Sequence, residues 1–159
     1  MVRIKTTKFS RPEGSGKRIA IVASEFNGFI TKRLLKACLA QLTKCGVREK
    51  DVTVCWVPGS YELPLTALTL AKKKNIHAVI CLGCVIRGET FHFELVAQGA
   101  ARGIMEASLM SGKPVIFAVL TTDTLAQAKK RSQEKGDNKG LDAAVAAVHM
   151  ANLMQRINT

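Results

Sequence analysis

The apolar positions of this chain follow two spacings, one typical of buried strands and one typical of helices. Nearly uninterrupted apolar runs predict four strands, at residues 19–23, 52–57, 78–86 and 114–120. Helical spacing and turn signals predict helices at residues 31–45, 62–74, about 90–110 and 124–134, and a last helix after residue 140. Because strands alternate with helices, the pattern predicts a parallel α/β sheet with right-handed crossovers.

Two helical segments carry further information. The first places Leu34, Cys38 and Leu42 on one face, which we expect to pack on the sheet. The last is apolar almost all round between residues 143 and 154. Such a helix is buried on several sides, which favours contact with another subunit, although a helix tucked under a loop also fits.

Composition indicates one folded domain spanning residues 1–159, with 47% apolar and 23% charged residues. We expect residues 1–17, which are polar and basic, to form an N-terminal segment that contacts a neighbouring subunit. No apolar run has the length of a membrane span, and the N-terminus lacks the apolar region of a secretory signal. We therefore expect no membrane partner.

The net charge of +12 allows nucleic-acid binding, but the basic residues are scattered along the sequence. Aromatic residues that could stack on bases are not interleaved with them. We expect no nucleic-acid partner, and interpret the charge as a basic surface that draws in phosphorylated metabolites.

Cysteine usage favours a reducing compartment. The five cysteines are an odd number and lie mostly in apolar stretches, which indicates reduced core thiols and a cytoplasmic location. Cys81 and Cys84 form a CxxC motif, but on a strand positions three apart face opposite sides. No second ligand pair for zinc is present, so we interpret both as packing residues.

Candidate chemistry gathers where the third strand ends. In open α/β sheets, ligands bind beyond the carboxyl ends of the strands, and the run 78–86 leads directly into Arg-Gly-Glu-Thr-Phe-His at 87–92. Gly88 permits close backbone approach, and N–H groups at a helix start favour an anion. His92 can move a proton near neutral pH, so we interpret it as a catalytic residue in preference to a structural one.

Residues after the other strands are open to two interpretations. Phe26 could stack on a planar heterocycle, although such aromatic residues more often fill the edge of a core. Glu62 could accept hydrogen bonds from sugar hydroxyls or complement a helix dipole. Arg131 and Lys139 could bind a phosphate or be solvated surface charges. The polar run 121–124 is explained by capping of the following helix.

Taken together, these strand ends resemble the lumazine synthase family. The matching stretches are Phe26-Asn27, Val57–Pro64, Leu82–Thr90, His92–Glu94, Pro114–Phe117, Leu120–Thr122, Gln127-Ala128, Arg131 and Asn138–Gly140. They stand in family order over about residues 18–155, and the complete set is far more specific than any single stretch.

The resemblance implies a three-layer flavodoxin-like domain with a four-stranded parallel sheet flanked by helices. It also implies a homopentamer with active sites between neighbours, which in some members pairs into a decamer or builds an icosahedral shell. The expected activity is that of a transferase without cofactor or metal. It condenses 5-amino-6-(D-ribitylamino)uracil with 3,4-dihydroxy-2-butanone 4-phosphate to 6,7-dimethyl-8-ribityllumazine, phosphate and water, the penultimate step of riboflavin biosynthesis. Riboflavin synthase is a further candidate partner.

By similarity, site roles transfer to particular residues of this chain. The pyrimidine and its ribityl chain are bound by Phe26, Ser60, Tyr61, Glu62, Cys84, Val85, Ile86, Phe117 and Lys139. The butanone phosphate is seated by Glu89, Thr90 and Arg131, while His92 handles protons. Of these residues, Phe117, Arg131 and Lys139 are expected to come from the adjacent subunit.

The chain departs from the usual family pattern at four places. Ala118 stands where the family generally has glycine, and Phe91 is bulky where smaller residues are common. The loop 132–137 differs from the usual small, glycine-containing loop, and His149 replaces a common glutamate. None of these departures removes a proposed catalytic group.

Three other functions remain alternatives at this stage. An archaeal-type riboflavin synthase has a similar subunit, but the run 87–92 argues against it. A non-catalytic flavin- or lumazine-binding protein would have no need of the phosphate-binding Arg131. A basic nucleic-acid-binding scaffold would show binding that depends steeply on salt.

Overall fold

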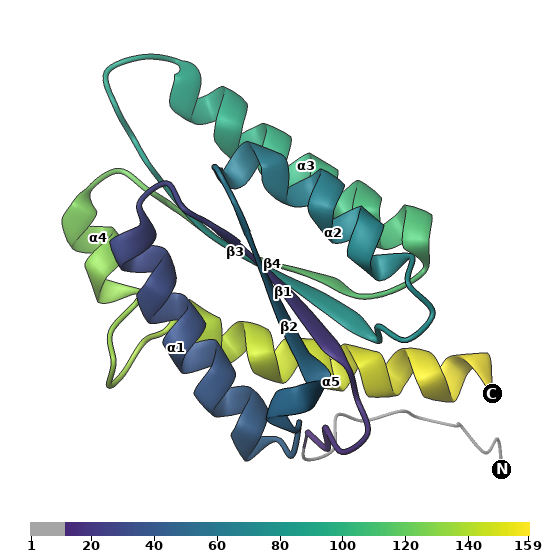
Figure 1. Cartoon of the computed structure of the whole chain (residues 1–159). Coiled ribbons are helices and arrows are strands. Elements are labelled where there is room, and N and C mark those ends of the chain that lie inside the picture. Colours follow the sequence, from purple (N-terminus) through teal and green to yellow (C-terminus); the bar gives the residue numbers. More distant parts are fainter. Residues whose placement is uncertain (1–11) are drawn as a thin grey trace, which may run out of the picture.

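The computed structural model describes residues 12–159 as a four-stranded, all-parallel sheet with helices on both faces (Figure 1). The predicted N-terminal segment 1–17 falls largely on residues 1–11, which lie outside the described part. Its remaining residues pack on the chain itself, since Gly14 N–H donates to the Cys45 carbonyl at 2.6 Å.

The elements follow one another as the alternation of spacings predicts. In chain order they are β1 (Ile19–Ser24), α1 (Gly28–Lys44), the 3-10 turn η1 (Glu49–Asp51), β2 (Val52–Val57), the 3-10 turn η2 (Ser60–Glu62), α2 (Leu63–Ala71), β3 (Ala78–Ile86), α3 (His92–Ser111), β4 (Val115–Thr122), α4 (Leu125–Lys130) and α5 (Lys139–Asn158).

Several element boundaries differ from the prediction. The helix expected over 124–134 ends at Lys130, because Ser132 and Asn138 form an antiparallel bridge that turns the chain into a short hairpin. Thr121 and Thr122 belong to β4, where they pair with Val85 and Ile86 of β3. Only the final residue of the predicted cap acts as one: the Thr124 hydroxyl accepts a hydrogen bond from the Gln127 N–H.

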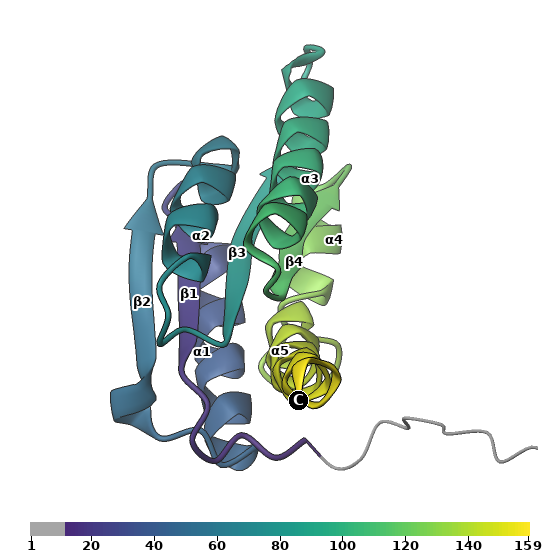
Figure 2. The same cartoon turned by 90° about the vertical axis from the view of Figure 1, so that its right-hand side faces the viewer.

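The strands lie side by side in the order β2-β1-β3-β4 (Figure 2). In Figure 1, α2 and α3 cover one face of the sheet, and α1, α4 and α5 cover the other. Alternate strand residues therefore enter two separate apolar cores. On β3, Cys81 packs in the α2/α3 core and Cys84 in the α1/α5 core, so the CxxC cysteines face opposite sides as predicted.

The last helix packs closely on the first. Gly140, at the start of α5, lies against the backbone of α1, where a Cβ atom would stand 2.1 Å from the Leu34 carbonyl oxygen. The buried residues of α5 are Gly140, Ala143, Ala144, Ala147, Val148 and Ala151. Contacts within the subunit therefore bury the face of α5 that lies on α1 and the sheet. On its other face, Val145, Ala146 and Met150 remain partly exposed.

Candidate active site

A crevice opens between β1 and β3 at the carboxyl end of the sheet. Pairing of β1 with β3 stops at Ala23 and Leu82, whereas β3 continues beside β4 as far as Ile86 and Thr122. The β1-facing edge of residues 84–86 therefore has no strand partner. The connection from β1 runs to β2 on one side of this crevice, and the connection from β3 runs to β4 on the other side. In open α/β sheets, ligands bind where the strand order reverses in this way.

Asn27 creates this opening. It has a left-handed backbone conformation with φ of 55°, an arrangement that asparagine tolerates better than most residues, and it turns the chain from β1 into α1. Its side-chain amide donates a hydrogen bond of 2.9 Å to the Cys84 carbonyl. That carbonyl is thus already paired, which leaves the backbone groups of Ile86 as the available part of the strand edge, because those of Val85 face β4.

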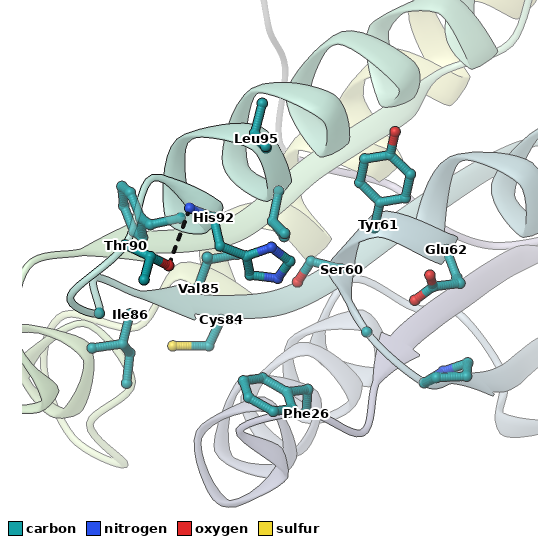
Figure 3. Close-up of a pocket in the computed structure, with 15 residues that line it drawn as sticks. Phe26, Ser60, Tyr61, Glu62, Cys84, Val85, Ile86, Thr90, His92 and Leu95 are labelled. Carbon is teal, nitrogen blue, oxygen red and sulfur yellow. Dashed lines mark hydrogen bonds between the residues drawn. The ribbon is translucent and has the colours of Figure 1, made fainter.

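The crevice widens into a cavity of about 750 Å³ (Figure 3). Its lining residues come from the ends of the first three strands and from α3: Phe26, Pro58, Gly59, Ser60, Tyr61, Glu62, Cys84, Val85, Ile86, Gly88, Thr90, His92, Phe93, Leu95 and Val96. Nine residues expected from the sequence thus line one cavity, namely Phe26, Ser60, Tyr61, Glu62, Cys84, Val85, Ile86, Thr90 and His92.

Phe26 forms one wall of this cavity. Its backbone N–H donates to the Pro58 carbonyl at 3.0 Å, which fixes the loop after β1 to the loop after β2. The ring itself is 71% exposed and is therefore not used to fill the core. An aromatic face held open beside an unpaired strand edge suits a planar heterocycle.

His92 begins α3 on the opposite wall. Figure 3 shows its imidazole pointing into the cavity, toward Ser60 and Val85. The His92 N–H lies 3.4 Å from the Thr90 hydroxyl oxygen, a long hydrogen bond that steadies the turn into the helix. No protein atom lies within 4 Å of a Cβ built on Gly88, so the chain's own packing leaves this part of the loop open.

The segment Ser60–Glu62 is set in place by two glycines. A Cβ on Gly83 would stand 2.6 Å from the Ser60 hydroxyl oxygen, and a Cβ on Gly99 would stand 2.6 Å from the Tyr61 ring. Only glycine lets η2 approach β3 and α3 this closely. Ser60 is consequently buried, while the Tyr61 ring lies on α3 at the rim of the cavity (Figure 3).

Ionic contacts brace the loop between β3 and α3. Arg87 pairs with Asp123 at 2.8 Å and with Glu94 in the first turn of α3, and its guanidinium lies 4.3 Å from the centroid of the Phe93 ring. The hydrogen bond from Arg87 lowers the pKa of Glu94 below its ordinary value. The brace holds the start of α3, and with it His92, relative to β4.

A second hollow, of about 500 Å³, lies across β4 from the first and shares no lining residue with it. It contains three further expected site residues, Phe117, Arg131 and Lys139. Asp137 lies 3.9 Å from Arg131 and 3.3 Å from Lys139, and it keeps the two cations on one short hairpin. Hydrogen bonds to Asp142 and Asp137 raise the pKa of Lys139.

The two hollows face different sides of the sheet. Arg131 follows α4 on the α1/α5 side, whereas His92 begins α3 on the α2/α3 side (Figure 1). Within one subunit, Arg131, which is expected to bind the phosphate, therefore lies apart from His92, which is expected to transfer protons, whereas Thr90 lines the same cavity as His92. Ala118, the residue that departs from the usual glycine, lines the second hollow.

Three lining residues were not assigned a role from the sequence, and one residue predicted for the site lies outside both hollows. Leu95 and Val96 share the face of α3 with His92, a signal that the spacing i, i+3, i+4 could have given. Phe93 was part of the motif but had no assigned role. Glu89 is exposed on the loop and does not line either hollow.

All five cysteines are unpaired, as the sequence predicts. Burial raises the pKa of the Cys84 thiol to about 11, so this cysteine is protonated at neutral pH and is a poor nucleophile. Within residues 12–159, no group of three His, Cys, Asp or Glu side chains is arranged to hold a metal ion. No helix in this part of the chain is long and apolar enough to cross a membrane.

Fold and cavity together define a flavodoxin-like α/β protein with a ligand crevice at the β1/β3 switch point. The family model for 6,7-dimethyl-8-ribityllumazine synthase matches residues 16–155. The chain belongs to this family, whose members are transferases of riboflavin biosynthesis.

Proposed function

We propose that this protein condenses 5-amino-6-(D-ribitylamino)uracil with 3,4-dihydroxy-2-butanone 4-phosphate to give 6,7-dimethyl-8-ribityllumazine, phosphate and water. The proposal rests on one observation: an aromatic side chain, a strand edge without a partner strand and a histidine line the same cavity. Family membership over residues 16–155 supports the same reaction.

The pyrimidine would lie between Phe26 and the edge of β3. The N–H and C=O groups of Ile86 face the side of β3 that has no partner strand here, and a donor beside an acceptor matches the edge of a uracil. Glu62, which lines the same cavity, would accept hydrogen bonds from the ribityl hydroxyls. The turn that contains Ser60 and Tyr61 would close the floor of the pyrimidine site.

The phosphate would lie at the β3–α3 loop, near Gly88 and Thr90. This loop leads into the N-terminus of α3, where unpaired N–H groups favour an anion. Glu89 is exposed on the same loop, so its proposed part is limited to the backbone. A guanidinium is needed to balance the phosphate charge, and the residue expected for this, Arg131, lies in the second hollow.

We infer that the site is completed by a neighbouring copy of the chain. That copy would contribute Phe117, Arg131 and Lys139 from its second hollow to the cavity of the first. Because the two half-sites lie on different sides of one subunit, the contact is head-to-tail and closes into a ring, for which we propose a pentamer. We also propose that the protein is located in the cytoplasm and that it binds riboflavin synthase.

The chemistry requires little beyond alignment. The substrate amine attacks the ketone and water leaves, phosphate is eliminated, and the ring closes with loss of a second water, so the substrates supply both nucleophile and leaving group. The protein holds them in register, which replaces a bimolecular encounter by a reaction within the complex. Arg131 balances the departing phosphate, and His92 transfers protons beside the condensing carbonyl.

A direct assay tests this function. The purified protein, given both substrates, should form the lumazine, detected by its absorbance and by mass, and should release one phosphate for each lumazine. Given the lumazine alone, it should form no riboflavin, which separates the proposal from a riboflavin synthase. Tight lumazine binding without turnover would instead identify a binding protein.

A further inference from the structure

The charged residues of the chain are distributed unevenly between the two ends of the sheet. All four strands are parallel, so the segments that precede them meet at one end, which we call the amino end. The cavity and the second hollow lie at the other end. Charged residues that are scattered in the sequence can therefore be counted separately for each end of the sheet.

The amino end is strongly basic. Its ten basic residues are Lys17, Arg18, Lys44, Arg48, Lys50, Lys72, Lys73, Lys74, Lys113 and Arg156, against the three acidic residues Glu13, Glu49 and Asp51. At the carboxyl end, nine basic residues stand against eight acidic ones: Lys32, Arg33, Lys36, Arg87, Lys129, Lys130, Arg131, Lys135 and Lys139, against Glu25, Glu62, Glu89, Glu94, Asp123, Glu134, Asp137 and Asp142. Nearly all of the excess charge in the described residues thus lies away from the proposed active site.

Contacts join the basic residues of the amino end into one surface. His77 exchanges hydrogen bonds of 2.9 Å with the backbone of Arg18 through its own N–H and its Nδ1 atom. The Lys113 ammonium donates to the Lys73 carbonyl at 2.6 Å, and the Lys17 ammonium donates to Gln155 of α5. The surface therefore reaches across the strand starts to the end of α5.

The acidic residues at this end leave most of that charge uncompensated. Asp51 is the only carboxylate of the described amino end that forms ion pairs, with Arg48 at 2.7 Å and Arg18 at 3.5 Å. The run Lys72–Lys74 is exposed and forms no ion pair within residues 12–159. At the centre of the surface, the pKa of His77 is lowered, first by burial and then by repulsion from Lys17 and Lys113.

The reaction proposed above makes no use of this charge. A field that drew phosphorylated substrates to the site would be placed around the carboxyl end, where the charges nearly cancel. The sequence of residues 1–11 has the same sign of charge, since it contains four basic and no acidic side chains. The expectation that the basic surface serves the substrates therefore does not match the placement of its charges.

We propose that the amino end of the sheet binds the phosphate backbone of nucleic acid without regard to sequence. Neighbouring strand starts are about 4.8 Å apart, so the basic row spans roughly 15 Å of the sheet edge. Duplex nucleic acid presents one phosphate charge per about 1.7 Å of axis, which suits a row of exposed, flexible lysines. This inference goes beyond the proposed enzymatic function and does not depend on it.

Sequence-independent binding follows from the residue types. The segments 12–18, 44–51, 72–77 and 111–114 contain no Phe, Tyr or Trp that could stack on a base. Lysine is a point charge that contacts phosphates without the bidentate geometry used to recognise base edges. Of its arginines, Arg18 and Arg48 are paired with Asp51, so the surface contacts a backbone chiefly through its lysines.

Fluorescence anisotropy with a labelled duplex of about 20 base pairs, over about 50 to 300 mM salt, tests this proposal. The K72Q/K73Q/K74Q variant should bind at least tenfold more weakly at about 100 mM salt, with a salt slope shallower by about 2.7. The charge-matched control K32Q/K129Q/K130Q, at the carboxyl end, should lose less than threefold. K72R/K73R/K74R should retain binding, and both Lys72–Lys74 variants should keep full lumazine-forming activity.

Competitors distinguish nucleic acid from other polyanions. Polyglutamate and vesicles containing phosphatidylserine, at equal charge concentration, should displace the duplex less well than unlabelled RNA or DNA does. Better displacement by either competitor would assign the surface to an acidic protein or a membrane and overturn the proposal. Equal losses in the two charge-matched triple variants, or no binding by the native protein, would also overturn it.

Discussion

Individual side chains of the cavity divide into those that bind and those that move protons. Phe26 presents a ring for stacking, whereas His92 projects an imidazole from the start of α3 toward the place proposed for the condensing carbonyl. A substitution at each residue should therefore affect a different kinetic quantity.

The His92→Ala variant should lower turnover more than it weakens pyrimidine binding. General acid–base help contributes about a hundredfold to ten-thousandfold, and we expect the lower end or less because alignment accounts for much of the acceleration. Steady-state kinetics measures turnover, and direct titration with the ribitylaminouracil measures binding. The comparison variant Phe26→Ala should weaken pyrimidine binding more than it lowers turnover. Unchanged turnover with lost binding would assign His92 to substrate binding.

The Arg131→Ala variant should raise the KM for the butanone phosphate. Loss of a charge-assisted hydrogen bond costs about 1.5–3 kcal/mol, equivalent to about tenfold to a hundredfold in KM. Lys130→Ala is the matched control, because Lys130 is the exposed neighbouring cation in the last turn of α4. If both variants raise KM equally, the effect reflects general charge and not a contact from Arg131.

His77 predicts how stability depends on pH. Burial and the nearby Lys17, Lys113 and Arg18 lower its pKa from the ordinary 6.5. Below pH 6.5 the unfolded chain therefore binds more protons than the folded one, so the free energy of unfolding should fall as pH decreases through this range. The loss should level off once the pH is below the pKa of the folded state.

The His77→Asn variant checks this assignment. Its side-chain oxygen can accept the hydrogen bond from Arg18 N–H but does not titrate. Denaturation midpoints measured from about pH 7.5 to about pH 5 at constant protein concentration should fall less steeply than those of the native protein. Parallel curves for the two proteins would show that other groups dominate this pH range.

At the scale of elements, close backbone approaches decide how the helices sit on the sheet. The crossing of α1 and α5 depends on Gly140, because a Cβ there would stand 2.1 Å from the Leu34 carbonyl oxygen. The same principle places η2 against β3 at Gly83 and against α3 at Gly99. These glycines are needed for space, and none of the three has a positive φ.

Gly140→Ala should destabilise the protein by about 1–3 kcal/mol, the usual cost of forcing atoms into a packed contact. Gly28→Ala is the matched control, because Gly28 also lies at a helix start but has no atom within 4 Å of its Cβ position. Chemical denaturation should show a lower midpoint for the first variant and an unchanged or higher one for the second. Equal midpoints would mean that α5 shifts to accommodate the methyl group at little cost.

For the whole molecule, the separation of the two half-sites predicts activity that depends on neighbouring subunits. A variant with His92→Ala and Glu62→Ala keeps an intact second hollow, and Arg131→Ala keeps an intact cavity. Reassembled from a denatured equimolar mixture, head-to-tail contacts should make about a quarter of the sites fully native. Activity should then exceed that of either variant alone.

The complementation also tests the oligomer itself. Either variant refolded alone serves as the control, and light scattering gives the mass of each assembly. A fully active monomer, or a mixture no more active than the mean of its components, would contradict a site shared between subunits.

The alternation of apolar and polar spacing was sufficient to predict the parallel sheet, its four strands and the residues of α1 that face the core. Strand β3 has the predicted bounds, because a strand buried on both faces is marked by a continuous apolar run. The same pattern locates the strand ends that carry Phe26, Glu62 and His92, whereas the other site residues were expected from the resemblance to the family.

Only the tertiary structure decided what depends on distances between segments remote in sequence. Helix α4 stops at Lys130 because Ser132 pairs with Asn138, although residues 133–135 are good helix formers. The open edge of β3 exists because β1 turns away at Asn27, and the Arg87 brace joins three segments across the sheet end. The charge was likewise scattered in sequence and gathered in space, because parallel strands bring all of their starting segments to one end of the sheet.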